Sequence, residues 1–143
     1  MRKMFTILVI ALVSALFAMC SKKHSIPIES SWAIDKLFVE GNEISIPAGH
    51  NPYLAFLSDS KISGETGCNR FFGDFAVKGK GITFTNMGST RMMCPDMAFE
   101  NAWLGTIQET AAFTISGSKL TLKDKDGNII AILSKIEPTS MEN

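Results

Sequence analysis

Two short segments, each with one cysteine, constrain this chain more than any other feature. Residues 63–75 combine a cysteine with glycines and phenylalanines, and residues 89–97 contain the second cysteine beside methionines and a proline. Glycine adopts positive φ angles without steric cost and lets another strand approach closely, so the glycines predict bend points in a curved sheet. The two cysteines, Cys68 and Cys94, are predicted to pair with each other. The glycines of the first segment are Gly64, Gly67 and Gly73.

The first 20 residues have the layout of a lipoprotein signal peptide. A charged start is followed by an apolar run over residues 4–19, too short to span a bilayer comfortably, and then by Cys20. The usual lipobox has leucine three positions before the cysteine and a small residue directly before it, whereas Phe17 and Met19 stand here. The layout therefore resembles the looser boxes of some bacterial groups. The alternative is an ordinary secretory signal cleaved near Ala18, or an uncleaved anchor.

Cleavage after residue 19 would make Cys20 the lipid anchor of the mature chain. Two or more acyl chains give stable anchoring, since each buried CH₂ contributes about 0.8 kcal/mol. Residues 20–31 are polar and aperiodic, which predicts a flexible tether. The pair Lys22-Lys23 lacks the acidic run that some bacteria use for export to the cell surface. We therefore expect a lipid-anchored membrane protein that faces the periplasm, on the outer membrane.

The remaining chain predicts one domain over residues 32–136 and a disordered tail over residues 137–143. Fourteen basic and fourteen acidic residues give a formal net charge of zero. No basic stripe follows the leader, so nucleic-acid binding has no electrostatic basis. We expect a monomer.

Short alternating segments separated by turn residues predict a mainly β fold. Within residues 97–111, by contrast, Phe99, Trp103, Ile107 and Ala111 recur every four residues, which predicts one amphipathic helix over about 96–111 with Pro95 and Asp96 at its first turn. Together these patterns predict a small antiparallel sheet, curled or barrel-like, covered by the helix. The predicted strands cover residues 32–39, 43–46, 53–57, 61–64, 71–77, 82–85, 112–115, 119–123 and 129–133.

The cysteines allow two interpretations. In an oxidising envelope, with Cys20 lipidated, Cys68 and Cys94 are the only pair that can form a disulfide, which would stabilise the fold by about 3 to 4 kcal/mol. Two buried free thiols are the alternative. A free thiol would leave open a cysteine-dependent enzyme with His50 as its base, but a lone loop histidine is more often solvated. No catalytic residue is therefore assigned.

Soft-metal chemistry is a further alternative. Met92, Met93, Cys94 and Met97 bring thioethers and a thiol together, and these ligands suit Cu(I). Methionines near a helix start more often fill gaps in a core, and the histidines that usually accompany them are missing. We therefore expect no metal and no cofactor, and keep copper handling as the alternative function.

Two polar positions are interpreted as structural. Asn69 in a sharp turn is expected to adopt a left-handed conformation or to bond backbone groups that the bend leaves unpaired. Arg91 is expected to pair with Glu100 or Asp96, since a guanidinium group offers several donors in a fixed fork.

The order of these motifs along the chain resembles the META domain, the HslJ-like family of small bacterial envelope proteins. The resemblance spans nearly the whole domain, and its two central motifs are specific in combination. The matching residues are Trp32, Phe56, Ser63-Gly64, Gly67-Cys68-Asn69-Arg70-Phe71, Gly73, Thr90-Arg91-Met92-Met93-Cys94-Pro95, Phe99-Glu100 and Leu120-Thr121-Leu122 before Asp126-Gly127.

The resemblance implies a compact β-rich domain with a helix, exposed on an envelope lipoprotein and linked in some members to heat shock and antibiotic tolerance. It supplies no catalytic residue and no ligand. We therefore expect a non-catalytic binding or stress-response module whose partner is an envelope protein, a peptide or a small hydrophobic compound. The motif residues that form a possible interaction surface are Gly67, Asn69, Arg70, Phe71, Arg91 and Glu100.

Overall fold

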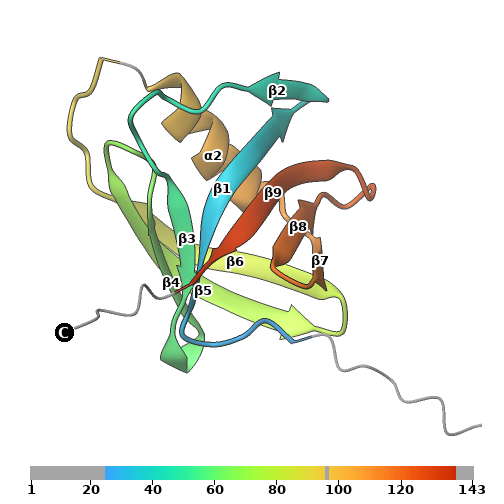
Figure 1. Ribbon diagram of the computed structural model, residues 1–143. Coiled ribbons are helices and arrows are strands. Elements are labelled where there is room, and N and C mark those ends of the chain that lie inside the picture. The colour runs from blue at the N-terminus through green and yellow to red at the C-terminus, as the bar shows by residue number, and fades with distance from the viewer. Residues whose placement is uncertain (1–24, 96, 138–143) are drawn as a thin grey trace, which may run out of the picture.

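The computed structural model describes residues 25–95 and 97–137, which form an antiparallel β-barrel with one helix (Figure 1). The mainly β class predicted from the sequence is thus confirmed. A short 3₁₀ turn, η2 (Ser58–Ser60), links two of the strands, and α2 spans Ala98–Glu109. The strands are β1 (Ser30–Val39), β2 (Asn42–Ile44), β3 (Tyr53–Phe56), β4 (Lys61–Glu65), β5 (Arg70–Lys78), β6 (Gly81–Ser89), β7 (Ala112–Ser116), β8 (Lys119–Lys123) and β9 (Ile129–Ile136).

The barrel closes where the first and last strands pair. The order is β1-β3-β4-β5-β6-β7-β8-β9, and β9 returns to β1 from Ser31↔Ile136 to Leu37↔Ala131. Strand β2 adds to the end of β1 outside this ring. Closure removes the exposed edges that an open sheet of this size would leave.

The seam between β6 and β7 is the weakest part of the ring. These strands share one registered pair, Gly81↔Ala112, and then diverge. Helix α2 connects them and packs against both β6 and β1. Helix α2 therefore covers the part of the barrel that strand pairing leaves open.

Curvature comes from local irregularities, as the glycine pattern predicted. The register of β5 with β6 shifts between Phe72 and Asp74, around Gly73, which is the signature of a bulge. Gly64 has a different role from the predicted bend, because a Cβ there would lie 2.2 Å from the Tyr53 carbonyl oxygen and 2.3 Å from Cζ of Phe71. It allows close packing instead.

Large side chains fill the barrel interior. Trp32 and Trp103 are fully buried, and the Phe56 ring meets the Phe75 ring edge-on at a centroid distance of 5.0 Å. Among the described residues, Nε1 of Trp103 is the buried side-chain nitrogen that lacks a hydrogen-bond partner. The other fully buried large side chains are Phe71, Phe99, Phe113, Leu37, Leu54, Ile62, Ile82, Ile107 and Leu120.

The helix follows its predicted pattern but is shorter than 96–111. Phe99, Trp103 and Ile107 are buried, as their spacing predicted. The helix begins at Ala98 after an N-cap at Met97, so Pro95 precedes it and does not occupy its first turn. The acidic residue of the first turn is Glu100.

Within the described residues, core packing begins at Ile26, since this side chain belongs to the core and β1 starts at Ser30. Both residues lie inside the segment predicted as a tether. The predicted signal peptide, Cys20 and nearly all of the predicted tail lie outside the described residues. Within the described part of the chain, no helix is long and apolar enough to cross a membrane.

Candidate functional site

The two cysteine segments meet around the side chain of Asn69, which is fully buried. Its Oδ1 accepts hydrogen bonds from the Thr90 hydroxyl at 2.8 Å and the Met92 amide at 2.7 Å. Its Nδ2 donates to the Met92 carbonyl oxygen at 3.1 Å and to Oε1 of Glu100 at 2.9 Å. One side chain thereby joins the β4–β5 loop to the segment after β6 and to the helix, and the expectation that Asn69 bonds unpaired backbone groups is confirmed.

The carboxylate of Glu100 is the buried acidic group of this network. Its Oε2 accepts from the Thr66 hydroxyl at 2.6 Å and from the Asn69 amide at 3.2 Å. Glu100 also stands in the first turn of α2, where the helix dipole favours negative charge. These donors and the dipole take the place of a cation. Among the described residues, no ion pair joins Arg91 to Glu100. Asp96, the other partner predicted for Arg91, lies outside the described residues.

A disulfide joins Cys68 to Cys94, with a Cα–Cα distance of 6.4 Å. Cys68 follows Gly67, whose φ of +99° only glycine adopts readily, and Cys94 lies shortly before α2. The bridge thus ties the β4–β5 loop to the start of the helix. The predicted pairing is confirmed, and the interpretation as two buried free thiols is wrong.

The six motif residues predicted as an interaction surface differ in their exposure to solvent. Most of them are buried or half-buried in the two motif segments and therefore support the fold. Asn69, Phe71 and Glu100 are buried, Gly67 is half-buried, and Arg70 and Arg91 are exposed.

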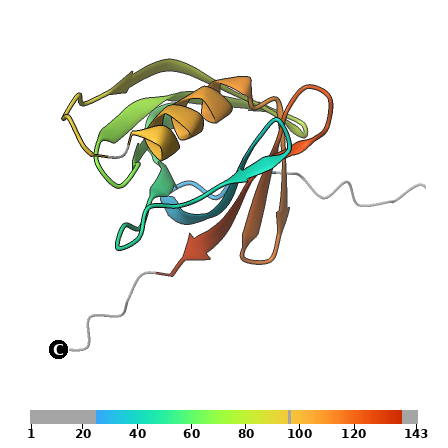
Figure 2. The same ribbon diagram turned by 90° about the horizontal axis from the view of Figure 1, so that it is seen from above.

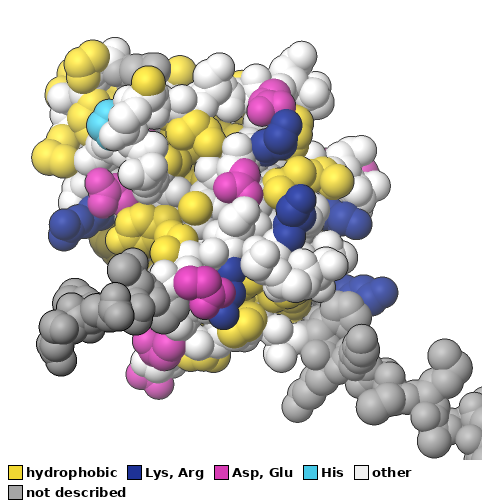
Figure 3. All heavy atoms as spheres, in the orientation of Figure 1, with side chains coloured by type: hydrophobic (Ala, Val, Ile, Leu, Met, Phe, Trp, Pro, Cys, Tyr) yellow, Lys and Arg dark blue, Asp and Glu magenta, His cyan; other side chains and the backbone are white. Residues whose placement is uncertain are grey.

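A small hollow of about 270 Å³ lies beside the disulfide. His50 borders it and packs over Gly67, where a Cβ would meet the His50 Cβ at 2.9 Å. Met92 and Met93 are 57% and 98% exposed, and Figure 3 shows hydrophobic side chains gathered at the corner where the loop from β6 to α2 runs. The ligand set considered for the alternative function of copper handling lacks its thiolate, because Cys94 is bridged.

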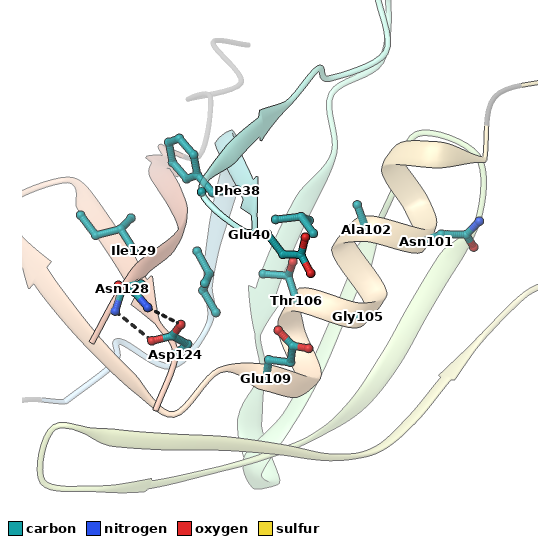
Figure 4. A pocket seen from close by; sticks show the side chains of 13 residues that line it. Phe38, Glu40, Asn101, Ala102, Gly105, Thr106, Glu109, Asp124, Asn128 and Ile129 are labelled. Atoms are coloured by element: carbon teal, nitrogen blue, oxygen red, sulfur yellow. Dashed lines mark hydrogen bonds between the residues drawn. The ribbon is translucent and has the colours of Figure 1, made fainter. Parts of the chain in front are cut away.

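A larger cleft, of about 600 Å³, lies along α2, between the helix and the elements that face it. Figure 2 shows the helix and the β1–β2 hairpin on opposite sides of the barrel mouth, and the cleft is formed between them and the β8–β9 loop. We call it the helix cleft. Figure 4 shows Glu40 and Glu109 projecting into it from two of these elements. Its lining residues are Phe38, Val39, Glu40, Gly41, Asn101, Ala102, Gly105, Thr106, Glu109, Asp124, Asn128, Ile129 and Ile130.

The carboxylate of Asp124 is held rigidly at one wall of the helix cleft. Its Oδ1 accepts from the amides of Asp126 at 2.9 Å and Asn128 at 2.8 Å, and its Oδ2 accepts from Nδ2 of Asn128 at 2.9 Å. The side-chain bond from Asn128, followed by these backbone bonds, lowers the pKa of Asp124. The group is therefore both oriented and ionised at neutral pH.

Sequence reasoning did not single out the helix cleft. Its lining residues come from the β1–β2 hairpin, from α2 and from the β8–β9 loop, and no local sequence pattern joins these three elements. The available sequence signal for the cleft was Glu109, an acidic residue in the last turn of the helix, where a basic residue is favoured.

The described residues contain no clear metal site. No group of three or more histidine, cysteine, aspartate or glutamate side chains is arranged to hold a metal ion there.

Comparisons with known proteins agree on the fold. A family profile described as the META domain matches residues 26–136. No curated protein matches significantly. An NMR structure of a protein from Burkholderia xenovorans is 20% identical with a TM-score of 0.65, and the alignment covers 83% of this chain and 97% of that one. A crystal structure of a DUF4847 family protein from Bacteroides vulgatus is 10% identical with a TM-score of 0.55, covering 74% and 92%.

Proposed function

Because this chain belongs to the META domain family, we propose that it is a non-catalytic binding module of the bacterial cell envelope that uses the helix cleft. Lipid on Cys20 anchors it to the outer membrane facing the periplasm, and residues after Cys20 tether the barrel. It acts in heat shock or antibiotic tolerance by binding a partner. The observation that carries the proposal is the helix cleft itself.

The size and lining of the helix cleft support binding. Its volume of about 600 Å³ falls within the range of about 300 to 1,000 Å³ typical of ligand sites. The lining combines the polar side chains of Asn101 and Asn128 with apolar ones such as Ile129. The polar groups can orient a ligand, and the apolar groups can bury its apolar surface. Asn101 and Ile129 are also exposed, so they are free to contact a ligand.

The motif cysteines give less support to catalysis. While Cys68 and Cys94 are bridged, neither offers the thiolate that a nucleophile requires. His50 remains as a single exposed imidazole beside them. The two motifs are better explained as the framework that holds the helix in place.

Site-specific photocrosslinking in intact cells tests the proposal. A photoreactive residue at Asn101, inside the helix cleft, is expected to capture a defined partner, whereas the same residue at Thr83, exposed on β6, is not. Gly105→Phe should abolish the capture, because no atom lies within 4 Å of a Cβ at Gly105 and the ring would fill the cleft. Equal capture from both positions, or capture that survives Gly105→Phe, would exclude the helix cleft as the binding site.

A further inference from the structure

The helix cleft carries charge of one sign. Glu40, Glu109 and Asp124 line it, and no lysine, arginine or histidine does. They come from three separate elements, the β1–β2 turn, the end of α2 and the loop after β8. Like charges brought together in this way raise the local concentration of cations.

The helix adds to this negative potential. Glu109 is the last residue of α2, and the last turn contains no basic residue. The C-terminal end of a helix carries a partial negative charge, which a lysine or arginine usually offsets. No basic residue in the last turn of α2 neutralises this partial negative charge, so a cationic ligand would do so.

The acidic side chains of the helix cleft take part in no ion pair among the described residues. The ion pairs there are Lys36–Glu43, Lys61–Asp74, Lys125–Asp126 and Lys135–Glu137. Glu40, Glu109 and Asp124 therefore keep their charge available to a ligand.

Apolar side chains accompany the acidic ones. Val39 is 37% exposed and Ile129 47%, on the neighbouring strands β1 and β9, which line one wall of the helix cleft. On the wall formed by α2, Gly105 leaves the helix backbone bare, so a ligand backbone can approach closely. A small hydrophilic cation would leave these apolar groups in water, whereas a peptide with alternating basic and apolar residues would cover both kinds of surface.

We infer that the helix cleft binds a basic, partly apolar peptide segment of an envelope protein, with lysine or arginine side chains on Glu40, Glu109 and Asp124. This inference rests on the proposed binding function. It adds the chemical class of the partner, which is set by charge complementarity with the cleft. Because the contacts are partly exposed ion pairs, salt weakens the complex.

Isothermal titration of the full-length lipidated protein in detergent tests the inference. The probe is the acetylated and amidated peptide Leu-Lys-Leu-Lys-Leu-Lys, compared with peptides in which glutamine or glutamate replaces lysine. We expect the glutamate peptide to bind at least tenfold more weakly than the lysine peptide. Equal affinities for the two would overturn the inference, and so would spermidine binding as tightly as the lysine peptide.

Charge-matched variants locate the interaction. Glu40→Gln and Glu109→Gln should each weaken the lysine peptide at least threefold. Glu65→Gln removes the same charge from β4, outside the helix cleft, and should leave the affinity unchanged. Equal effects of all three substitutions would mean a non-specific attraction and would also overturn the inference.

The two proposals fail in different ways. If photocrosslinking from Asn101 captures a partner through an acidic or uncharged segment, the cationic inference is wrong while the binding function stands. If nothing is captured and no lysine peptide binds, both are wrong.

Discussion

Nδ2 of Asn69 lies 2.9 Å from Oε1 of Glu100, although 31 residues separate the two in sequence. Both side chains are buried, and the Asn69 backbone amide donates to the other carboxylate oxygen, Oε2, at 3.2 Å. The asparagine thus satisfies a buried carboxylate at the start of α2 while its Oδ1 accepts from the chain after β6. Asn69 therefore joins the first motif segment both to the second segment and to α2, independently of the disulfide.

Replacing Asn69 with alanine should destabilise the barrel by at least about 3 kcal/mol, because buried partners on Glu100 and Met92 lose hydrogen bonds at about 1 to 3 kcal/mol each. Urea unfolding followed by tryptophan fluorescence measures this loss. The matched control is Asn101→Ala, an exposed asparagine of α2, which should change stability by less than about 0.5 kcal/mol.

A double-mutant cycle isolates the Asn69–Glu100 interaction. Asn69→Ala combined with Glu100→Gln should cost less than the sum of the single changes by at least about 1 kcal/mol, because the residues share one network. Strict additivity would show that the two side chains act independently.

Loss of the disulfide should lower stability by about 3 to 4 kcal/mol, chiefly by freeing the unfolded chain. Cys68→Ser and Cys94→Ser should be equally destabilised, and the double variant should be no less stable than either. Urea unfolding with and without reductant provides the check, since reduced wild type should match the double variant. Additive losses would be the contrary result.

Two glycines should respond to alanine in opposite ways. Gly105→Ala should stabilise the protein by up to about 1 kcal/mol, because it sits in a helix with open space around its Cβ position. Gly64→Ala should destabilise it by about 1 to 3 kcal/mol, since the new methyl group would overlap the Tyr53 carbonyl oxygen and the Phe71 ring. Thermal unfolding of both variants decides the point, and stabilisation by Gly64→Ala would contradict the packing described here.

Acid should selectively remove the contribution of Asp124. Hydrogen bonds from Asn128 and from backbone amides lower its pKa in the folded state, while the unfolded chain keeps a value of about 3.9. The contribution is therefore fully present above about pH 5 and is lost as the pH falls through the lowered folded pKa. Wild type and Asp124→Asn, compared by urea unfolding from pH 7 to pH 3, should converge in stability as the pH falls. A constant difference would rule out the ionised carboxylate as the cause.

The secondary structure could be predicted because it depends on local periodicity. Alternation over residues such as 119–123 marks a strand with one face in the core, and the four-residue spacing of Phe99, Trp103 and Ile107 marks a helix with one buried stripe. The start of the helix was misplaced because Pro95 fits a first turn by preference, whereas the disulfide at Cys94 and the N-cap at Met97 define the actual entry.

The sequence by itself determined the strands, the single helix, the barrel-like class and the pair of cysteines, since each depends on residue type and short-range spacing. Only the tertiary structure decided that Glu100 binds Asn69 and not Arg91, and that Glu40, Glu109 and Asp124 line one cleft. Those relationships join residues from separate elements, and the closure of β1 on β9 and the seat of α2 on the barrel fix their distances. A one-dimensional pattern contains no such distances.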